Sequence, residues 1–484
     1  MDLYKPIAQV ISDKFFKWFL AIVCVFNIGH NCMLLEHPFT GQNAWRDAQT
    51  YGVARNFLEE PGSFLEPKYD IRNSDDGRLP GEFPLQTLYT ASFMKLFGIT
   101  LFNARLANYI LGLFSALLLF YVLQRTKGIL TALVGIAIYS SNPLAMSQMV
   151  AVMPETMVSF LFCLSLFWYY FIKNSYLKWG LVIITITLCT LVKPSGFVII
   201  LFFISHHFFY HQFKVNKSSF LLYSGLVIIP VVFLVLWMKY TMQFENPQFG
   251  YPITHHYVRT FKDFLHDFDG VVVITALEKT FRHAFNVSGI LGLILLGFFA
   301  FKKPQILKQE SYWNTSIGLW ILGSIAFLFY AGIVQNVQLY YATPLIVPAV
   351  LLVGKSLSVK GYLRILVMLI ILLQTNIKVN TFNENFFNEK KNWDKYRLES
   401  TTDKWSTRKD LFIVYPYPFP EFTMLGRLGR RGYNLNTPEA MEREISKFKF
   451  ICVVDTNRRH EILKYVNGSP IEVIRELEFY KVKE

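Results

Sequence analysis

The sequence is poor in charged residues. Only 17% of its 484 residues are Asp, Glu, Lys or Arg, whereas 53% are hydrophobic and 46 are phenylalanine. Soluble globular proteins carry about 25% charged residues. Together with a mean hydropathy of +0.32, this composition indicates a membrane protein.

The sequence also lacks the short motifs of several enzyme classes. It contains no P-loop, G-x-G-x-x-G or H-E-x-x-H pattern, so nothing supports ATP-driven pumping or zinc-protease chemistry. Its five cysteines show no metal-ligand spacing and imply no disulfide framework. No A-x-A-like cleavage site follows the first apolar run, which we therefore interpret as a retained span.

The chain has an excess of basic residues, with a formal net charge of +14. These residues do not gather in one patch or tail, so nucleic acid is not an expected partner. They recur in short clusters between apolar runs, which is typical of the cytoplasmic loops of a multispan protein.

About eleven apolar segments have the length of about 20 residues that a bilayer span requires. They lie near residues 16–35, 101–124, 129–149, 155–172, 176–192, 195–212, 219–238, 285–301, 315–334, 339–357 and 361–378. If the N-terminus is cytoplasmic and successive loops alternate between the two sides of the membrane, the cytoplasmic loops are 124–128, 173–178, 206–217, 301–308 and 355–360. Every one of these loops is basic, as the positive-inside rule requires. The pattern predicts a multi-pass plasma (inner) membrane protein.

The same alternation leaves three substantial segments outside the membrane. They are a first outer loop at 36–100, a second outer loop at 239–284 and the tail after the last span. Within the first loop, residues 41–60 show helical spacing. Residues 86–98 are amphipathic and too short to span, so we expect a helix in the interface.

The tail predicts a small α/β domain. Strand-like runs at 410–420, 449–455 and 471–484 flank a helical pattern at 437–448. The predicted fold class is therefore a polytopic α-helical membrane protein with a transmembrane domain, 1–378, and a small extracytoplasmic α/β domain, 379–484.

Polar and ionisable residues gather at the predicted outer ends of spans and in the outer loops. Such residues are costly near a bilayer and often mark function. Singly, Lys193 could snorkel to headgroups and Tyr340 and Tyr341 could anchor in the aromatic belt. As a set, these residues suit transfer of a group from a membrane-embedded phosphate ester, because cations hold phosphate and a carboxylate activates an acceptor. The set comprises Asp47, Asp75, Asp76, Glu82, Arg105, Glu155, Lys193, His255, His256, Arg259, Gln338, Tyr340 and Tyr341.

In order and spacing, several segments over residues 15–360 resemble the C-type (GT-C) membrane glycosyltransferases. The protein mannosyltransferase and lipid A aminoarabinose transferase families are the most similar. The segments are WRDAQTYGVARNF, GEFPLQTLYTASFMKLFG, ARLANYILGLFSALLLFYVLQR, MPETMVSFLFCLSLFWYY, TLVKPSGFVIILFF and QLYYATPLIVPAVLLVG. The resemblance implies a polyprenyl-phosphate sugar donor and a catalytic aspartate in the first outer loop.

Carried over by residue, the resemblance makes Asp47 the candidate catalytic base. The candidate donor-phosphate contacts are Lys193, Arg105 and Arg259. The candidate donor-cavity residues are Tyr51, Glu155, Gln338, Tyr340 and Tyr341. Many relatives have Asp-Glu where this chain has Asp47-Ala48, so Glu82 is our first candidate for a second carboxylate and Asp76 the second.

These observations predict an extracytoplasmic, inverting transfer of a sugar from a polyprenyl-phosphate donor to a lipid, glycan or protein acceptor. No cofactor is clearly implied; a divalent metal stays open, with Asp75, Asp76, His255 and His256 as candidate ligands. The alternatives are a lipid-linked sugar flippase or other transporter, a polysaccharide polymerase or ligase, and a non-catalytic scaffold.

Overall fold

The computed structural model describes part of the chain, and it divides into two compact units by internal contacts. Unit 1 is Met1–Leu35, Arg105–Gln243 and Pro252–Thr381; unit 2 is Glu36–Ala104, Phe244–Tyr251 and Phe382–Glu484. The described residues are 12–36, 39, 44–60, 62–70, 77–78, 81–211, 216–244, 290, 294, 311–334, 339–357, 363–382, 402–415, 425, 428, 430–434, 441–442, 445–474 and 477–483. The sequence-based boundary at residues 378/379 separates transmembrane from extracytoplasmic residues, whereas the two units are defined by internal contacts. That boundary therefore stays a prediction.

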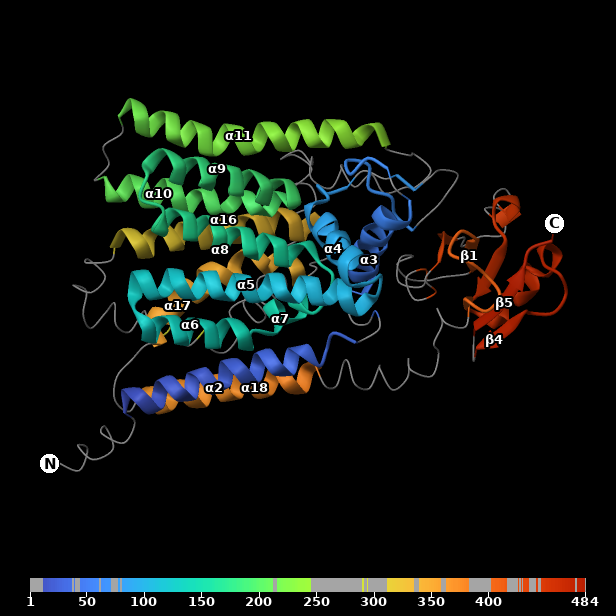
Figure 1. Ribbon diagram of the computed structural model, residues 1–484, viewed down its shortest axis with the longest axis horizontal. Helices are drawn as coiled ribbons and strands as arrows, with labels where there is room; N and C mark the ends of the chain where they lie inside the picture. The colour runs from blue at the N-terminus through green and yellow to red at the C-terminus, as the bar shows by residue number, and fades with distance from the viewer. Residues whose placement is uncertain are drawn as a thin grey trace. The chain divides into compact units, whose positions relative to one another are not determined.

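Unit 1 consists of apolar helices that lie side by side (Figure 1). Each predicted span coincides largely with one of them, except that 129–149 contains two and that 285–301 lies outside the described residues apart from Ile290 and Ile294. The helices are α2 (Asp13–Cys32), α5 (Leu101–Lys127), α6 (Ile129–Ser141), α7 (Pro143–Met149), α8 (Pro154–Phe171), α9 (Ser175–Val192), α10 (Ile200–Tyr210), α11 (Lys217–Thr241), α16 (Ser311–Val334), α17 (Thr343–Leu357) and α18 (Leu363–Phe382). Short 3₁₀ helices are η1 (Pro194–Ile199), η2 (Met242–Phe244) and η6 (Leu339–Ala342).

Four helices in the described part of the chain are long and apolar enough to cross a membrane, or five if one bent pair counts as a single span. That pair lies in the predicted span 129–149, where α6 and α7 meet at 69°. Pro143 has no N–H and disfavours helical backbone at Asn142. Asn142 instead caps α7, its Oδ1 accepting from the Ala145 N–H at 3.0 Å.

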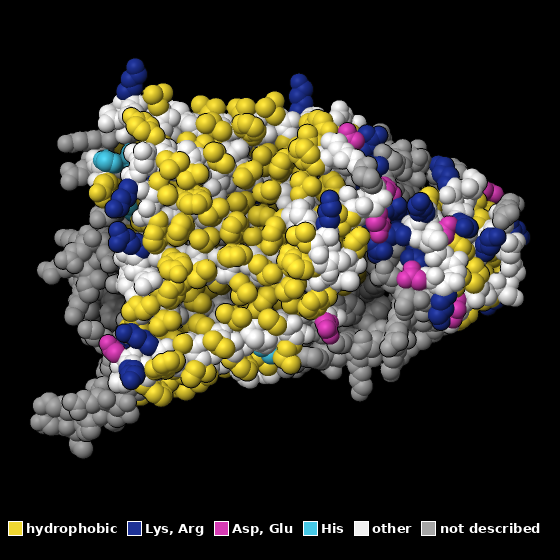
Figure 2. Space-filling model, viewed as in Figure 1, with side chains coloured by type: hydrophobic (Ala, Val, Ile, Leu, Met, Phe, Trp, Pro, Cys, Tyr) yellow, Lys and Arg dark blue, Asp and Glu magenta, His cyan; other side chains and the backbone are white. Residues whose placement is uncertain are grey.

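The face of unit 1 seen in Figure 2 is largely apolar. Helix α11 shows this most clearly, because only 17% of its apolar window is buried. Phe220, Leu221 and Leu236 are each more than half exposed. An exposed apolar surface of this extent is rare on soluble proteins and is what a helix facing lipid requires.

Helices α2 and α18 run parallel, side by side (Figure 1). Near their first residues, Asp13 forms an ion pair with Arg364. Near their last turns, the Asn27 Nδ2 donates to Thr375 Oγ1 at 3.1 Å, and the buried Lys378 Nζ donates to Asn27 Oδ1 at 2.9 Å. The chain therefore leaves both helices at the same end of unit 1.

Basic side chains gather at the opposite end, where α2 and α18 begin (Figure 2). Arg125 and Lys127 lie in the last turn of α5, and Lys217 is the first residue of α11. The Lys127 Nζ lies 5.0 Å from the centre of the ring of Trp313, which lies in the first turn of α16. Basic residues from separate predicted inner loops therefore share one end of the bundle.

Within the described part of the first outer loop, unit 2 forms the helices α3 (Ala44–Glu59) and α4 (Leu85–Phe97), at the positions that the sequence predicts. Leu96 and Phe97 at the end of α4 are exposed. That exposure suits the predicted interfacial position.

The tail forms a five-stranded sheet in the order β2-β1-β3-β5-β4, which we call the C-terminal sheet. Its strands are β1 (Leu411–Tyr415), β2 (Arg431–Asn434), β3 (Phe450–Val453), β4 (Glu472–Ile474) and β5 (Leu477–Lys481). β1 pairs in parallel with β2 and β3, whereas β5 pairs antiparallel with β3 and β4.

Both faces of the C-terminal sheet are buried. Phe412 and Val414 of β1 pack on one face, and Ile413 and Tyr415 on the other. This continuous apolar run is typical of a strand covered on both sides. The strands at β1, β3 and β5 lie where the sequence predicts them, whereas β2 was not predicted. Most of the predicted helix at 437–448 lies outside the described residues, apart from Met441, Glu442 and a 3₁₀ turn, η8 (Ile445–Lys447).

Candidate functional site

The candidate residues divide between the two units. Unit 1 contains Arg105, Glu155, Lys193 and Tyr341, whereas unit 2 contains Asp47, Tyr51 and Glu82. Six others lie outside the described residues: Asp75, Asp76, His255, His256, Arg259 and Gln338. Tyr340 belongs to η6, but its side chain also lies outside the described part.

Glu155 and Lys193 form a buried ion pair at the ends of two neighbouring helices. Pro154 and Glu155 open α8, where the helix dipole favours a negative charge. Lys193 is the C-cap residue of α9, followed at once by Pro194, which begins η1. Glu155 is 0% exposed and Lys193 4%, so the two opposite charges compensate each other away from solvent.

An aromatic ring covers the same cation. The Lys193 Nζ lies 4.9 Å from the centre of the Tyr341 ring. Tyr341 is buried in η6, just before α17. A desolvated ammonium beside a ring is attracted to its face, and the low local dielectric also strengthens its attraction to any anion, such as a phosphate oxygen.

A set of side-chain hydrogen bonds joins the elements around this pair. The Asn108 Nδ2, one turn after the buried Arg105 on α5, donates to Gln148 O at 2.7 Å and to Thr156 Oγ1 at 3.0 Å. The Gln148 Nε2 donates to Thr343 Oγ1 at 2.7 Å. The starts of α5, α8 and α17 are therefore tied together at one end of unit 1, where Arg105, Glu155 and Tyr341 lie.

Asp47 lies in the first turn of α3 and is 4% exposed. A carboxylate in that position gains from the positive end of the helix dipole. Tyr51, one turn later, is buried, with its ring centre 5.8 Å from that of Phe39. The candidate catalytic base is thus a buried carboxylate.

Glu82 contacts the first turn of α3 through Arg46, the residue before Asp47. It forms an ion pair with Arg46, whose Nη1 donates to Gln49 Oε1 at 2.9 Å. Burial raises the pKa of the neighbouring Tyr69 to about 12, while the Arg46 charge lowers it and the Glu82 charge raises it. Tyr69 therefore stays a neutral hydroxyl beside this charged pair.

Metal ligands do not cluster in the described part of the chain. No group of three or more His, Cys, Asp and Glu side chains there could hold a metal ion. The predicted metal candidates lie outside it, so the question of a divalent cation stays open.

Sequence reasoning missed several polar residues that organise the site. Asn108, Gln148 and Thr343 bridge helices in unit 1. Asn108 could have been identified as a buried polar residue three positions after Arg105 within an apolar span. Gln148 and Thr343 carry no comparable local signal.

A comparison with family models matches residues 82–238 to the dolichyl-phosphate-mannose-protein mannosyltransferases. That segment contains Arg105, Glu155 and Lys193. An uncharacterized protein of Aquifex aeolicus (strain VF5) is 28% identical over 183 residues, which cover 37% of this chain and 34% of that protein.

Solved structures are similar over nearly the whole chain. ArnT from Cupriavidus metallidurans, bound to undecaprenyl phosphate, matches 97% of this chain and 98% of its own with a TM-score of 0.61 and 11% identity. The oligosaccharyltransferase AglB from Archaeoglobus fulgidus, in complex with an inhibitory peptide and a dolichol-phosphate, covers 92% of this chain and 70% of its own, with a TM-score of 0.54 and 12% identity. As its sequence predicts, the chain therefore has the fold of the C-type membrane glycosyltransferases and is similar to the mannosyltransferase and ArnT families.

Proposed function

We propose that the protein transfers one sugar from a polyprenyl-phosphate donor to an acceptor at the extracytoplasmic face of the membrane. The observation that carries this proposal is the buried Glu155–Lys193–Tyr341 arrangement at one end of the helical unit. It lies in a fold shared with proteins whose structures contain undecaprenyl phosphate or dolichol-phosphate. A shared fold does not by itself establish a shared function; the chemistry of the individual residues supports the proposed roles.

Two cations are the proposed phosphate contacts. As the bond between the anomeric carbon and the phosphate oxygen breaks, negative charge grows on that oxygen and leaves with the polyprenyl phosphate. The buried Lys193 ammonium and the buried Arg105 guanidinium would stabilise this charge more strongly than groups in water could. Phosphate is a good leaving group, so the reaction needs no strong general acid.

Asp47 is the proposed general base. An acceptor hydroxyl attacks the anomeric carbon from the face opposite the phosphate, and its proton passes to the Asp47 carboxylate. One displacement of this kind inverts the configuration of the sugar. General-base assistance contributes about 10²–10⁴-fold to a rate, and Glu82, held by Arg46 beside Asp47, is the proposed second carboxylate.

The proposed extracytoplasmic location of the site rests on the distribution of basic side chains and on the direction of α2 and α18. The basic side chains gather where α2 and α18 begin, and such residues favour the cytoplasmic side. The opposite end of unit 1, which contains the Glu155–Lys193 pair, would then face outward.

The test uses purified full-length protein in lipid nanodiscs with a panel of labelled polyprenyl-phosphate sugars. Asp47→Asn should lower sugar transfer by about 10²–10⁴-fold and leave donor binding unchanged. The matched control is Asp455→Asn, since asparagine also caps the short helix that Asp455 begins. Near wild-type turnover in Asp47→Asn would contradict the assignment. Donor movement across the bilayer without cleavage would favour a flippase.

A further inference from the structure

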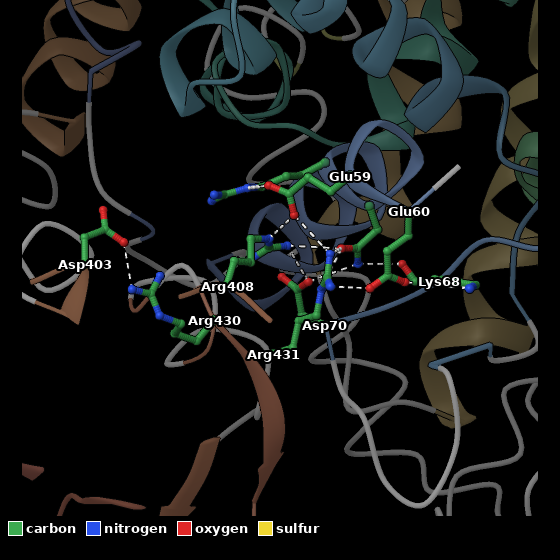
Figure 3. A network of polar contacts seen from close by, with 10 residues as sticks. Glu59, Glu60, Lys68, Asp70, Asp403, Arg408, Arg430 and Arg431 are labelled. Atoms are coloured by element: carbon green, nitrogen blue, oxygen red, sulfur yellow. Dashed lines mark hydrogen bonds and ion pairs between the residues drawn. The ribbon is translucent and has the colours of Figure 1, made fainter. Parts of the chain in front are cut away.

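Two arginines of the tail lie against the last turns of α3. Arg408 precedes β1, and Arg431 begins β2 at the edge of the C-terminal sheet. Their side chains are only 10% and 7% exposed. Figure 3 shows both guanidinium groups directed at the acidic end of α3, although about 350 residues separate them from it in sequence.

Asn56 of α3 is the centre of these contacts. Its Oδ1 accepts from Arg431 Nη2 at 2.9 Å and from Arg408 Nη2 at 3.2 Å. Its Nδ2 donates to Asp70 Oδ1 at 3.0 Å and to Lys68 O at 2.9 Å. Asn56 is 1% exposed, so this amide is satisfied by protein groups from three separate segments.

Three carboxylates balance the two arginines. Arg408 pairs with Glu59, and its Nη2 lies 2.7 Å from Asp70 Oδ1. Arg431 pairs with Glu60, and its Nη2 lies 3.0 Å from Glu59 Oε2. Each arginine thus bridges two carboxylates in a fixed fork geometry that lysine cannot reproduce. We call Asn56, Glu59, Glu60, Asp70, Arg408 and Arg431 the α3–sheet network.

Backbone contacts support the same arrangement. The Gly432 N–H of the edge strand β2 donates to Asp70 O at 2.9 Å, so the first outer loop satisfies a group that an edge strand leaves open. Gly52 of α3 leaves room for the Asp70 carboxylate, because a Cβ there would lie 2.5 Å from Asp70 Oδ2.

We infer that Arg408 and Arg431 are positioning residues that fix helix α3 and thereby the Asp47 carboxylate for catalysis. The inference rests on the proposed role of Asp47. Asn56 lies nine residues after Asp47 on the same helix, which is roughly 14 Å along its axis. A tilt of about 5° over that length moves the carboxylate by about 1 Å, and a 1 Å misplacement can lower a rate roughly 100-fold.

A buried ionic network suits positioning better than bulk stability. Buried ion pairs contribute little net stability compared with apolar packing, because desolvation offsets their attraction. Their directional bonds fix one geometry, however, and here both arginines hold α3 through several acceptors at once. In this inference the C-terminal sheet contributes to catalysis by holding α3 in position.

The experiment compares Arg408→Gln and Arg431→Gln with Arg408→Lys and Arg431→Lys in full-length protein in nanodiscs. The kcat per donor-binding site should fall roughly 10- to 100-fold in the Gln variants and recover in part with Lys. The KM for the donor should stay unchanged. Amide hydrogen exchange over residues 44–59 should become faster in the Gln variants. The control is Lys449→Gln, which removes an exposed ion pair with Asp410 from the same sheet.

The outcomes separate this inference from the proposed function. If Asp47→Asn abolishes transfer while both Gln variants keep full kcat, Arg408 and Arg431 do not position Asp47. Faster exchange over α3 with unchanged kcat leads to the same conclusion. A loss seen only as fewer donor-binding sites, with normal kcat per site, would show a purely structural role. If Asp47→Asn itself retains turnover, the proposed function fails first.

Discussion

Lys193 is expected to serve two purposes that substitutions can separate. Its ammonium compensates the fully buried Glu155 carboxylate, and in the proposed mechanism it also binds the donor phosphate. Removing one partner of a buried ion pair leaves an uncompensated charge, whereas removing both can be nearly neutral. Stability and donor binding should therefore respond differently to the single and the double substitution.

We predict that Lys193→Met destabilises the protein by about 3–5 kcal/mol and also weakens binding of polyprenyl phosphate. The double variant Lys193→Met/Glu155→Gln should regain most of the stability but none of the binding. Thermal unfolding in detergent measures the first effect, and titration with labelled polyprenyl phosphate the second. Full recovery of binding in the double variant would exclude Lys193 as a phosphate contact.

Buried polar residues explain why the site could be predicted only in part. Asp47, Glu155 and Lys193 stand out locally, because each is an ionisable residue beside an apolar run. Their partners do not stand out. Nothing near Glu155 in the sequence indicates Lys193, which lies 38 positions later and is brought close only by the packing of α8 on α9. Asn56 likewise reads as an ordinary polar position within a helix.

At the scale of elements, α3 shows how a single glycine admits a charged partner. The Cβ of an alanine at position 52 would lie 2.5 Å from Asp70 Oδ2. That carboxylate cannot easily move aside, because Arg408 and Asn56 hold its other oxygen. The close approach of α3 and the segment at 68–70 therefore depends on the missing side chain.

Gly52→Ala should destabilise the protein by about 1–3 kcal/mol, the usual cost of overpacking, despite the higher helix propensity of alanine. The matched control is Gly180→Ala in α9, where a Cβ would meet nothing within 4 Å. Hydrogen exchange over residues 44–60 and thermal unfolding measure both variants. Equal stability of the two would show that α3 and Asp70 can shift apart without loss.

Elements differ in how well the sequence predicts them. The spans follow from runs of about 20 apolar residues, and the strands β1 and β3 from short apolar runs next to turn residues. The bend between α6 and α7 was missed, although Asn142-Pro143 carries the signal for it. β2 was missed because RGYN has little strand character of its own and forms only through parallel pairing with β1.

At the scale of the whole molecule, the direction of two helices constrains the predicted membrane topology. Parallel first and last spans require an odd number of crossings. The contacts from Asp13 to Arg364 and from Asn27 to Thr375 show that α2 and α18 are parallel. The predicted set of about eleven spans satisfies this parity, including the segment at 285–301, which lies outside the described residues. The loop after α2 and the tail after α18 are then predicted to lie on the same side of the membrane.

An odd number of membrane crossings predicts the side of the membrane from which each segment can be labelled. In a Cys32→Ser background, which removes the exposed cysteine of α2, we introduce Tyr176→Cys before α9 or Lys464→Cys in the tail. Tyr176 is 92% exposed at the end rich in basic residues, and Lys464 is 56% exposed.

A membrane-impermeant maleimide should label Lys464→Cys in intact cells and Tyr176→Cys only after permeabilisation, because basic loops stay cytoplasmic. The parent Cys32→Ser protein, whose remaining cysteines are buried, controls for background labelling. Labelling of both positions from one side would contradict the odd number of crossings. Labelling with the two sides exchanged would keep the parity but place the candidate site in the cytoplasm, where an extracytoplasmic transfer could not occur.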